Sequence, residues 1–235
     1  SMPKVLHRLG GRALVQHVID SARQLSVRHI IAITGHGAEQ VESALAGQAG
    51  LHFARQMPQL GTGHAVQQAM PLLQDDGVTL ILSGDVPLTQ VATLQALLQA
   101  SQGTQLALLT LQTAQPTGYG RILRNANGQV QAIVEEKDAT PEQRAITEIY
   151  SGIMALPTRW LRAWLARIDN HNAQQEYYLT DIVKFAVADG QTVAAHVIDD
   201  RVQVDGVNSP VQLAALERAY QLRQAEALMA QGVRL

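Results

Sequence analysis

The chain of 235 residues carries 18 Lys and Arg against 20 Asp and Glu, a formal net charge of −2, which excludes the clustered basic surface of proteins that bind duplex DNA or anionic membranes. Hydrophobic residues make up 46% of the sequence and charged residues 16%, so the chain can bury a large core. There is no cysteine and no stretch near the roughly 20 apolar residues of a membrane span, which excludes disulfides, thiolate zinc sites and cysteine nucleophiles and predicts a cytoplasmic protein.

In the first half, short apolar runs alternate with apolar residues at helical spacing. Helices are predicted over residues 14–25, 41–45, 65–69 and 91–98, and strands over 30–33, 51–54, 78–82 and 105–111. Residues 78–82 are apolar on both faces, which is typical of a central parallel strand. The alternation predicts right-handed βαβ units and an open α/β sheet.

The second half has a different pattern. Two predicted strands, 121–123 and 130–134, flank Asn127-Gly128, a strong hairpin signal. Further strands are predicted over 147–156 and 192–198, and helices over 160–168, 178–188 and 211–229, the last ending before Gly232. These segments are interpreted as additions to one α/β domain.

Asp85 is the first candidate for chemistry. It follows the buried strand and a glycine, and ligands of open α/β sheets bind at the carboxyl ends of strands. A carboxylate there suits Mg²⁺ shared with substrate phosphates. Position alone is equally consistent with an Asp that caps a helix or forms a turn before Pro87.

Two glycine loops and a charge cluster are further candidates. Residues 56–63 precede a helix and would expose backbone N–H groups to an anion or a base edge, although an ordinary capped loop also fits. The loop matches neither a dinucleotide-binding fingerprint nor a P-loop. Residues 116–121 form the second loop. The charge cluster at 134–138 is consistent with a solvated face and also with the rim of a site.

Short motifs over the whole chain occur together in an order found in one known family. They are PKVLH at 3–7, GHG at 35–37, QLGTGHA at 59–65, GDVPL at 84–88, PTGYGR at 116–121, VEEKDAT at 134–140, NAQQEYYLTD at 172–181 and GVN at 206–208. The chain resembles the N-terminal uridylyltransferase domain of the bacterial bifunctional N-acetylglucosamine-1-phosphate uridylyltransferase / glucosamine-1-phosphate acetyltransferase.

The resemblance implies an α/β fold of the Rossmann-like nucleotidyltransferase (glycosyltransferase-A-like) type. Its mixed sheet would be flanked by helices, with a small β-hairpin insertion and a long C-terminal helix. It also implies that UTP and N-acetylglucosamine 1-phosphate, with Mg²⁺, give UDP-N-acetylglucosamine and pyrophosphate for peptidoglycan and lipopolysaccharide synthesis. Full-length family members also acetylate glucosamine 1-phosphate with acetyl-CoA.

The family's motifs also imply roles for individual residues. Asp85 and Asn208 would bind magnesium, and Lys4 would face the phosphates, so that Lys4 and Asp85 are the catalytic candidates. The other substrate-binding residues implied are, from uracil to ribose to sugar, Gln56, Gly61 and Thr62, then Ser83 and Gly84, then Gly120, Glu135 and Asn208. Catalysis would need in-line positioning and charge neutralisation without a general base, because the attacking sugar phosphate is already an anion.

The chain departs from the family at both ends. The family has a β-strand and a glycine-rich loop with an Arg before the first motif, so residues 1–208 are expected to form a nucleotidyltransferase domain without them, with two exposed strand edges. Two explanations are open: the sequence is trimmed, which the intact later motifs favour, or the protein has lost much of its activity. Residues 209–235 are expected to be a helix leading to an absent left-handed β-helix. That absent domain carries the acetyltransferase site and would be the only source of a homotrimer.

A third departure and two alternatives concern the sugar. Tyr150 stands where the family has an Asn that reaches the sugar, so the sugar contact and specificity at this position stay open. One alternative is a non-catalytic module that binds UDP-sugar, which the missing loop and Tyr150 favour, whereas Asp85 and Asn208 together favour an enzyme. The other alternative is a pyrophosphorylase for another sugar 1-phosphate. None of these alternatives involves nucleic acid or a membrane.

Overall fold

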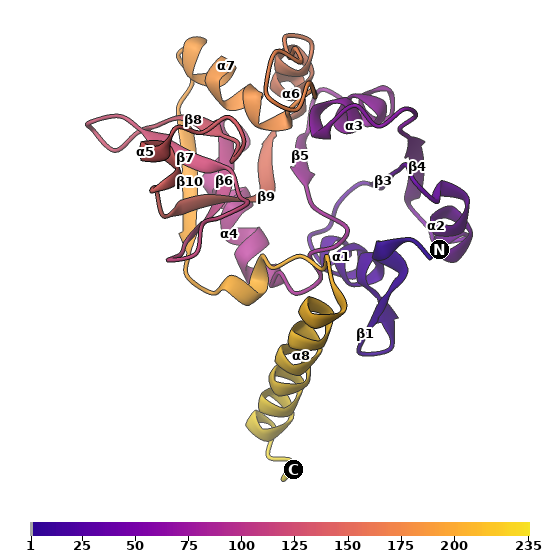
Figure 1. The fold of residues 1–235 in the computed structure, drawn as a ribbon. Helices are drawn as coiled ribbons and strands as arrows, with labels where there is room; N and C mark the ends of the chain where they lie inside the picture. The colour runs from indigo at the N-terminus through magenta and orange to yellow at the C-terminus, as the bar shows by residue number, and fades with distance from the viewer. Residues whose placement is uncertain (1) are drawn as a thin grey trace.

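One six-stranded sheet and two two-stranded sheets carry the strands of the computed structural model, which describes residues 2–235 (Figure 1). The first half comprises η1 Lys4–Leu6, β1 Arg8–Leu9, β2 Arg12–Ala13, α1 Leu14–Arg23, β3 Ile30–Thr34, α2 Ala38–Leu45, β4 Leu51–Arg55, α3 Thr62–Ala69, η2 Met70–Leu72, β5 Val78–Ile81, α4 Val91–Ser101 and β6 Leu106–Gln112. Each helix and strand predicted there is present. α1 forms because its apolar residues recur at helical spacing and bury Leu14, Ile19 and Ala22.

The second half also follows the predicted order. It comprises β7 Arg121–Arg124, β8 Val130–Val134, α5 Pro141–Arg144, β9 Glu148–Pro157, α6 Thr158–Leu165, η3 Leu179–Asp181, α7 Ile182–Ala188, β10 Val193–Ile198, η4 Arg201–Gln203 and α8 Pro210–Ala230. The predicted hairpin at Asn127-Gly128 joins β7 to β8, and the Asn125 side chain closes its turn by accepting from two backbone N–H groups. The predicted helix over 178–188 begins as the 3₁₀ turn η3 and continues as α7.

The larger sheet has the order β10-β6-β9-β7-β8, with β5 attached to β9. The mixed sheet is confirmed, because β6 and β10 are parallel while β9 runs antiparallel to β5, β6 and β7. The prediction of a central parallel strand at 78–82 was wrong. Among residues 2–235, β5 pairs only with β9, because this later strand enters in the opposite direction and separates β5 from β6.

β3 and β4 form a separate parallel pair. In Figure 1 they stand apart from the six-stranded sheet, beyond β5. Within the described part of the chain, one edge of β3 and one edge of β5 have no strand partner. In Figure 1 β3 lies between β4 and β5, so the unpaired edge of β3 is the one on the β5 side.

The two faces of β9 belong to two different hydrophobic clusters. Tyr150, Met154 and Leu156 pack with residues of α6 and α7, whereas Ile149 and Ile153 pack with residues of α4. The alternation follows from the pleat of the strand, in which successive side chains point to opposite faces. The central strand is thus covered by helices on both faces.

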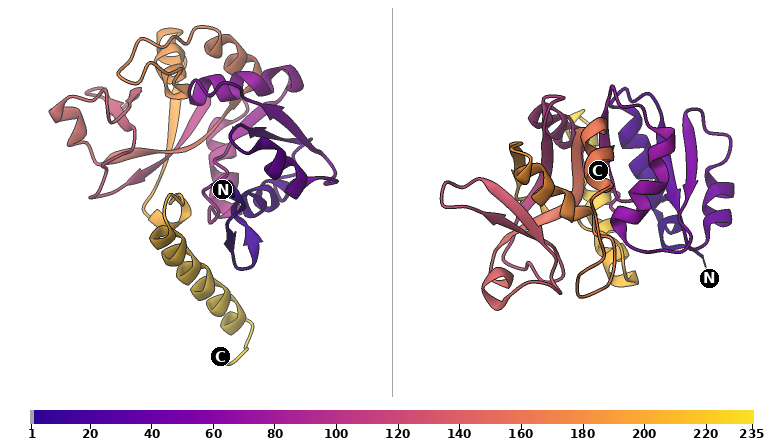
Figure 2. Two further views of the ribbon diagram at one scale, coloured as in Figure 1. Left: turned by 45° about the vertical axis from the view of Figure 1, so that its right-hand side comes forward. Right: turned by 90° about the horizontal axis from the view of Figure 1, so that it is seen from above.

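α8 is long and largely exposed, with Leu216 as its one buried residue. The left view in Figure 2 shows it extending from the body of the molecule toward the C-terminus. It is fixed to the body near its middle by Glu217, which accepts from the Gly10 N–H at 2.8 Å, and by Arg223, which donates to the Leu88 carbonyl at 2.8 Å. No helix within residues 2–235 has the length and apolar character needed to cross a membrane.

Candidate active site

Three of the predicted site residues converge on one point. The Lys4 ammonium, at the start of η1, donates to Asp85 Oδ2 at 2.7 Å and to Asn208 Oδ1 at 2.7 Å. Asp85 lies in the turn after β5, and its backbone carbonyl accepts from the Val207 N–H at 3.1 Å, which fixes the loop that carries Asn208. Segments that are 81 and 204 positions from Lys4 in sequence therefore supply one carboxylate and one amide oxygen to the same cation.

These two oxygens fit a hard divalent cation. Carboxylate and amide oxygens are preferred magnesium ligands, and Mg²⁺ commonly keeps its other positions for water and substrate phosphates. Among residues 2–235 no three His, Cys, Asp or Glu side chains surround a common metal position. A site built here would consequently depend on Asp85, Asn208 and the substrate. The side chains of Lys4 and Asp85 are 45% and 23% exposed, so their ion pair is worth at most about 1 kcal/mol and is readily replaced.

The predicted nucleotide loop is held by its own amide and by a later segment. Gln56 is buried, and its Nε2 donates to the Gly61 carbonyl at 2.9 Å. Gly61 has φ +117°, and a Cβ there would lie 2.6 Å from the Tyr177 carbonyl oxygen, so the position requires glycine. The Thr62 hydroxyl accepts from the Leu179 N–H at 3.0 Å. The loop is therefore docked on residues 177–179.

Ser83 and Gly84 lie between β5 and Asp85. A Cβ at Gly152 of β9 would come within 3.2 Å of Ser83 Oγ, which places the Ser83 hydroxyl against that strand. A Cβ at Gly84 would meet Val5 at 3.4 Å, which is ordinary contact. Ser83 and Gly84 consequently lie between the contact of Lys4 with Asp85 and Asn208 and strand β9.

Three predicted sugar residues form a row across neighbouring strands. Arg121 pairs with Val134 on one side and with Ile149 on the other, which puts Gly120 between Glu135 and Tyr150. The Tyr150 N–H donates to the Gly120 carbonyl at 2.9 Å. A Cβ at Gly120 would lie 2.8 Å from Ile133 Cγ2 and 3.6 Å from Glu135 Oε2. Glycine in the middle of the row therefore leaves room between its two larger neighbours.

The two side chains of this row are polar groups in an apolar setting. Glu135 is largely withdrawn from water, and this burial raises the pKa of its carboxyl, although the Thr180 hydroxyl donates to Oε1 at 2.9 Å. Tyr150 is 8% exposed, and its hydroxyl has no hydrogen-bond partner within the described residues. Burial likewise raises the pKa of the Tyr150 hydroxyl, with the Glu135 carboxylate adding to the shift.

Sequence reasoning missed the segment that joins these groups. The Tyr177 N–H donates to Leu60 O at 2.8 Å on the nucleotide side. On the sugar side the Tyr178 hydroxyl donates to Asp138 Oδ2 at 3.0 Å, and the Ala173 N–H donates to Asp138 Oδ1 at 2.8 Å. The motif at 172–181 contained these residues, but its spacing gave no sign of what they contact.

The structure thus divides the predicted residues into three groups. Lys4, Asp85 and Asn208 are in direct contact, Gln56, Gly61 and Thr62 share one loop, and Gly120, Glu135 and Tyr150 share one row. Within residues 2–235 no hydrogen bond joins Asn208 to the sugar row; it bonds instead with Lys4 and Gln212. Segment 172–181 contacts the second and third groups.

Comparison with known proteins shows the family to which the chain belongs. Residues 1–231 match the family described as the MobA-like NTP transferase domain. The chain is 68% identical over 244 aligned residues to the "Bifunctional protein GlmU" of Polaromonas naphthalenivorans (strain CJ2), and 56% identical over 237 to that of Bordetella petrii (strain ATCC BAA-461 / DSM 12804 / CCUG 43448). Each alignment covers 100% of this chain and 52% of the relative, so the chain spans about half the length of these curated relatives. The resemblance is confirmed: the chain belongs to the MobA-like NTP transferase family and is a nucleotidyltransferase.

Proposed function

We propose that this nucleotidyltransferase joins UTP to N-acetylglucosamine 1-phosphate, releasing pyrophosphate and forming UDP-N-acetylglucosamine, a precursor of peptidoglycan and lipopolysaccharide, in the cytoplasm. The observation that carries the proposal is that the side-chain oxygens of Asp85 and Asn208 converge on the Lys4 ammonium, at the end of β5. The similarity to relatives named bifunctional protein GlmU supports the choice of reaction.

Asp85 and Asn208 would hold the Mg²⁺ ion that the reaction requires. When bound, the metal supplies positive charge to the phosphate oxygens, whose negative charge opposes attack. Lys4 adds a second cation beside the same phosphates once its ammonium leaves the two oxygens that it now contacts. The sugar phosphate oxygen attacks the α-phosphorus of UTP, the bond to the pyrophosphate oxygen breaks, and no side chain need accept a proton.

The remaining residues would position the two substrates. Gln56, Gly61 and Thr62 would hold the uracil, with Ser83 and Gly84 beside the ribose. Gly120, Glu135, Tyr150 and Asn208 would line the sugar, where the Glu135 carboxylate can accept hydrogen bonds from hydroxyl groups. Positioning of this kind accounts for several kcal/mol of barrier lowering in bimolecular reactions, roughly 7 to 11 in well-oriented cases.

Residues 1–208 would be the nucleotidyltransferase domain and 209–235 a helix leading to further chain. The unpaired edges of β3 and β5 support a domain to which one more strand and its glycine-rich loop belong. The half-length coverage of the relatives supports a longer protein. Acetylation of glucosamine 1-phosphate and assembly into a trimer would reside in that further chain.

A binding module for UDP-sugar without turnover is the second candidate, and the open edges of β3 and β5 favour it. Pyrophosphate release from UTP and N-acetylglucosamine 1-phosphate with Mg²⁺ separates the two. We expect wild-type chain to release pyrophosphate and D85A to lose Mg²⁺-dependent turnover by at least about 100-fold, since it removes the one carboxylate at the cation.

Near-normal turnover of D85A would remove Asp85 from the metal site. Binding of UDP-N-acetylglucosamine by the wild type with no turnover would support the binding module. Turnover with a different sugar 1-phosphate alone would assign another hexose, and Y150N is expected to lower the KM for N-acetylglucosamine 1-phosphate if position 150 faces the sugar.

A further inference from the structure

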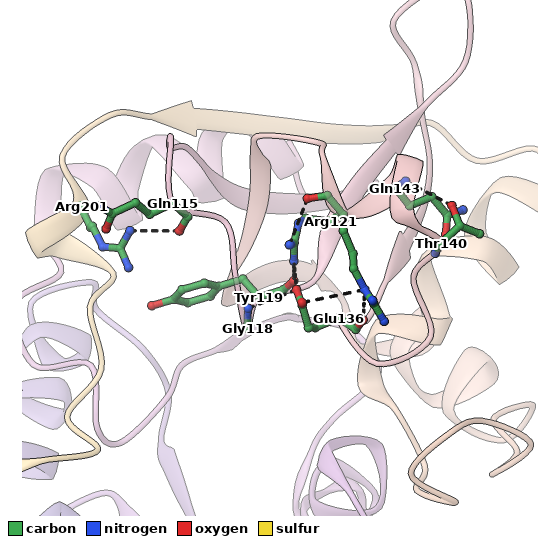
Figure 3. Close-up of polar contacts among 9 residues, drawn as sticks. Gln115, Gly118, Tyr119, Arg121, Glu136, Thr140, Gln143 and Arg201 are labelled. Atoms are coloured by element: carbon green, nitrogen blue, oxygen red, sulfur yellow. Dashed lines mark hydrogen bonds and ion pairs between the residues drawn. The ribbon is translucent and has the colours of Figure 1, made fainter.

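Arg121 is the most deeply buried charged side chain of the described structure, with 1% of its side chain exposed. A buried guanidinium is retained only where carboxylates and carbonyls surround it. Its Nη1 lies 2.7 Å from Glu136 Oε2 and also donates to the Tyr119 carbonyl, and its Nη2 donates to the Arg144 carbonyl at 3.2 Å. Figure 3 shows Arg121 and Glu136 meeting beside Gly118 and Tyr119.

The Glu136 carboxylate contacts the same turn. Oε2 accepts from the Gly118 N–H at 3.2 Å in addition to Arg121, and both interactions lower the pKa of this carboxyl, the Arg121 contact most strongly. Glu136 is therefore ionised at neutral pH. One ion pair consequently fixes the turn at 118–119 to the loop after β8.

The ion pair lies on the opposite face of the strands from the sugar row. Arg121 pairs with Ile149, which packs with α4, whereas Tyr150 of the row packs with α6 and α7. Because successive side chains of β9 point to opposite faces, Arg121 and its partner Glu136 lie on the α4 face. Because the cross-strand register puts Gly120 opposite Glu135, the Arg121–Glu136 pair joins, from behind, the two segments that carry these residues.

A second arginine holds the start of the same loop. Arg201 donates to Thr113 Oγ1 at 3.2 Å and to the Gln115 carbonyl at 3.3 Å, and its guanidinium carbon lies 5.7 Å from the centre of the Tyr119 ring. Its Nε donates to Asp205, three residues before Asn208, at 3.0 Å. The loop is thus fixed at both ends, and Arg121 holds the end that leads into Gly120 (Figure 3).

We propose that the buried Arg121–Glu136 ion pair is a positioning element for the sugar, which sets the separation of Gly120 and Glu135 without touching the substrate. The proposal rests on the proposed function, since it assumes that this row binds the sugar of a UDP-sugar. Neutralising Glu136 leaves the guanidinium buried without a counter-charge, so the turn and the Glu135 loop are expected to shift apart.

The test compares UDP with UDP-N-acetylglucosamine, which share the nucleotide and differ in the sugar. Dissociation constants are measured by titration calorimetry on the 235-residue chain as wild type, E136Q, E136D and R121K. E136D keeps the charge with a shorter reach, and it decides the question if E136Q or R121K does not fold. R124Q is the matched control, because Arg124 lies on the same strand and pairs with Glu148 at 2.7 Å, and so contacts neither the turn at 118–119 nor the Glu135 loop.

We expect the Kd for UDP-N-acetylglucosamine to rise about tenfold or more in E136Q and R121K, less in E136D, and the Kd for UDP to stay within about twofold. R124Q should leave both constants unchanged. Unchanged UDP-N-acetylglucosamine binding in E136Q, or a parallel loss for both ligands, would overturn the positioning role while leaving the proposed function intact. A wild-type chain that binds neither ligand would overturn both.

Discussion

Tyr150 and Tyr178 are both buried and differ in whether their hydroxyls are paired. The Tyr178 hydroxyl donates to Asp138 and accepts from Gln174 Nε2 at 2.9 Å, whereas the Tyr150 hydroxyl is buried without a partner. A buried polar group that makes no hydrogen bond costs about 1 to 3 kcal/mol, so a fold retains one where it serves another purpose.

Y150F is therefore expected to raise the free energy of unfolding by about 1 kcal/mol, because it removes an unpaired hydroxyl and keeps the ring in the core. Y178F, the matched variant, should lower it by about 1 to 2 kcal/mol through the loss of two hydrogen bonds. Urea unfolding of both variants measures the difference. If Y150F destabilises the chain as much as Y178F, the Tyr150 hydroxyl has a partner such as a buried water.

The two adjacent carboxyls, Glu135 and Glu136, respond to pH with opposite signs. Burial raises the pKa of Glu135, so the folded state holds this proton to higher pH than the unfolded chain does, and stability falls as pH rises from 4.5, the unperturbed value, through the raised value. The pKa of Glu136 is lowered, chiefly by Arg121, so its contribution is present above 4.5 and is lost as pH falls through the lowered value.

E135Q should accordingly gain stability relative to wild type as pH rises from 4 to 7, since glutamine has no proton to lose. E136Q should do the reverse, losing stability relative to wild type as pH rises through the lower end of the same range, and the gap should be constant above about pH 5.5. Urea unfolding at four pH values between 4 and 7 gives both curves. A gap between E135Q and wild type that does not change with pH would mean that Glu135 titrates near its ordinary value when folded.

At the scale of elements, the sequence predicts what is local and misses what depends on pairing. The Asn127-Gly128 hairpin and the order of helices and strands follow from turn chemistry and periodicity. The apolar run at 78–82 indicates burial on two faces but carries no information on direction, so its antiparallel pairing with β9 was not predictable. That partner lies some 75 residues later in the chain.

The same limit applies to the site. Asp85 was predicted from its position after a strand, and the resemblance supplied Asn208 and the sugar residues. Arg121 and Glu136 read as a strand residue and one member of a charge run, and only the register of β7 and β8 brings them together. Thr180, which donates to Glu135, was missed because the two residues are 45 positions apart.

Docking of the β4–α3 loop on residues 177–179 gives a prediction at this scale. G61A is expected to lower the free energy of unfolding by more than about 2 kcal/mol, because a Cβ would strike the Tyr177 carbonyl and the backbone at φ +117° disfavours it. G47A, with φ +76° and open space around its Cβ, should cost only about 1 kcal/mol. Equal losses in thermal unfolding would show that the loop moves away from residue 177.

At the scale of the whole molecule, two parts meet along β5. One part is the six-stranded sheet with α4, α6 and α7, and the other contains α1, α2, α3 and the β3–β4 pair (Figure 2). Side chains join them beside β5, where Arg162 donates to the carbonyls of Met70 and Leu73, and Arg28 pairs with Asp76 at 2.8 Å. These side-chain contacts do not involve the backbone groups of β3 and β5, so one edge of each strand stays without a strand partner.

Hydrogen exchange should therefore divide the strands by their number of partners. β9 has β6 along one side and β7 and β5 along the other, so its amides and those of β6 should exchange most slowly. Amides on the open edges of β3 and β5 should exchange at least about tenfold faster, since opening them breaks no ladder on that side. The measurement is made at two protein concentrations, because open edges can also pair between molecules.

Protection of β3 and β5 that equals that of β9 at the lower concentration would mean that these edges are covered within one chain. Protection that appears only at the higher concentration would assign the cover to a second copy.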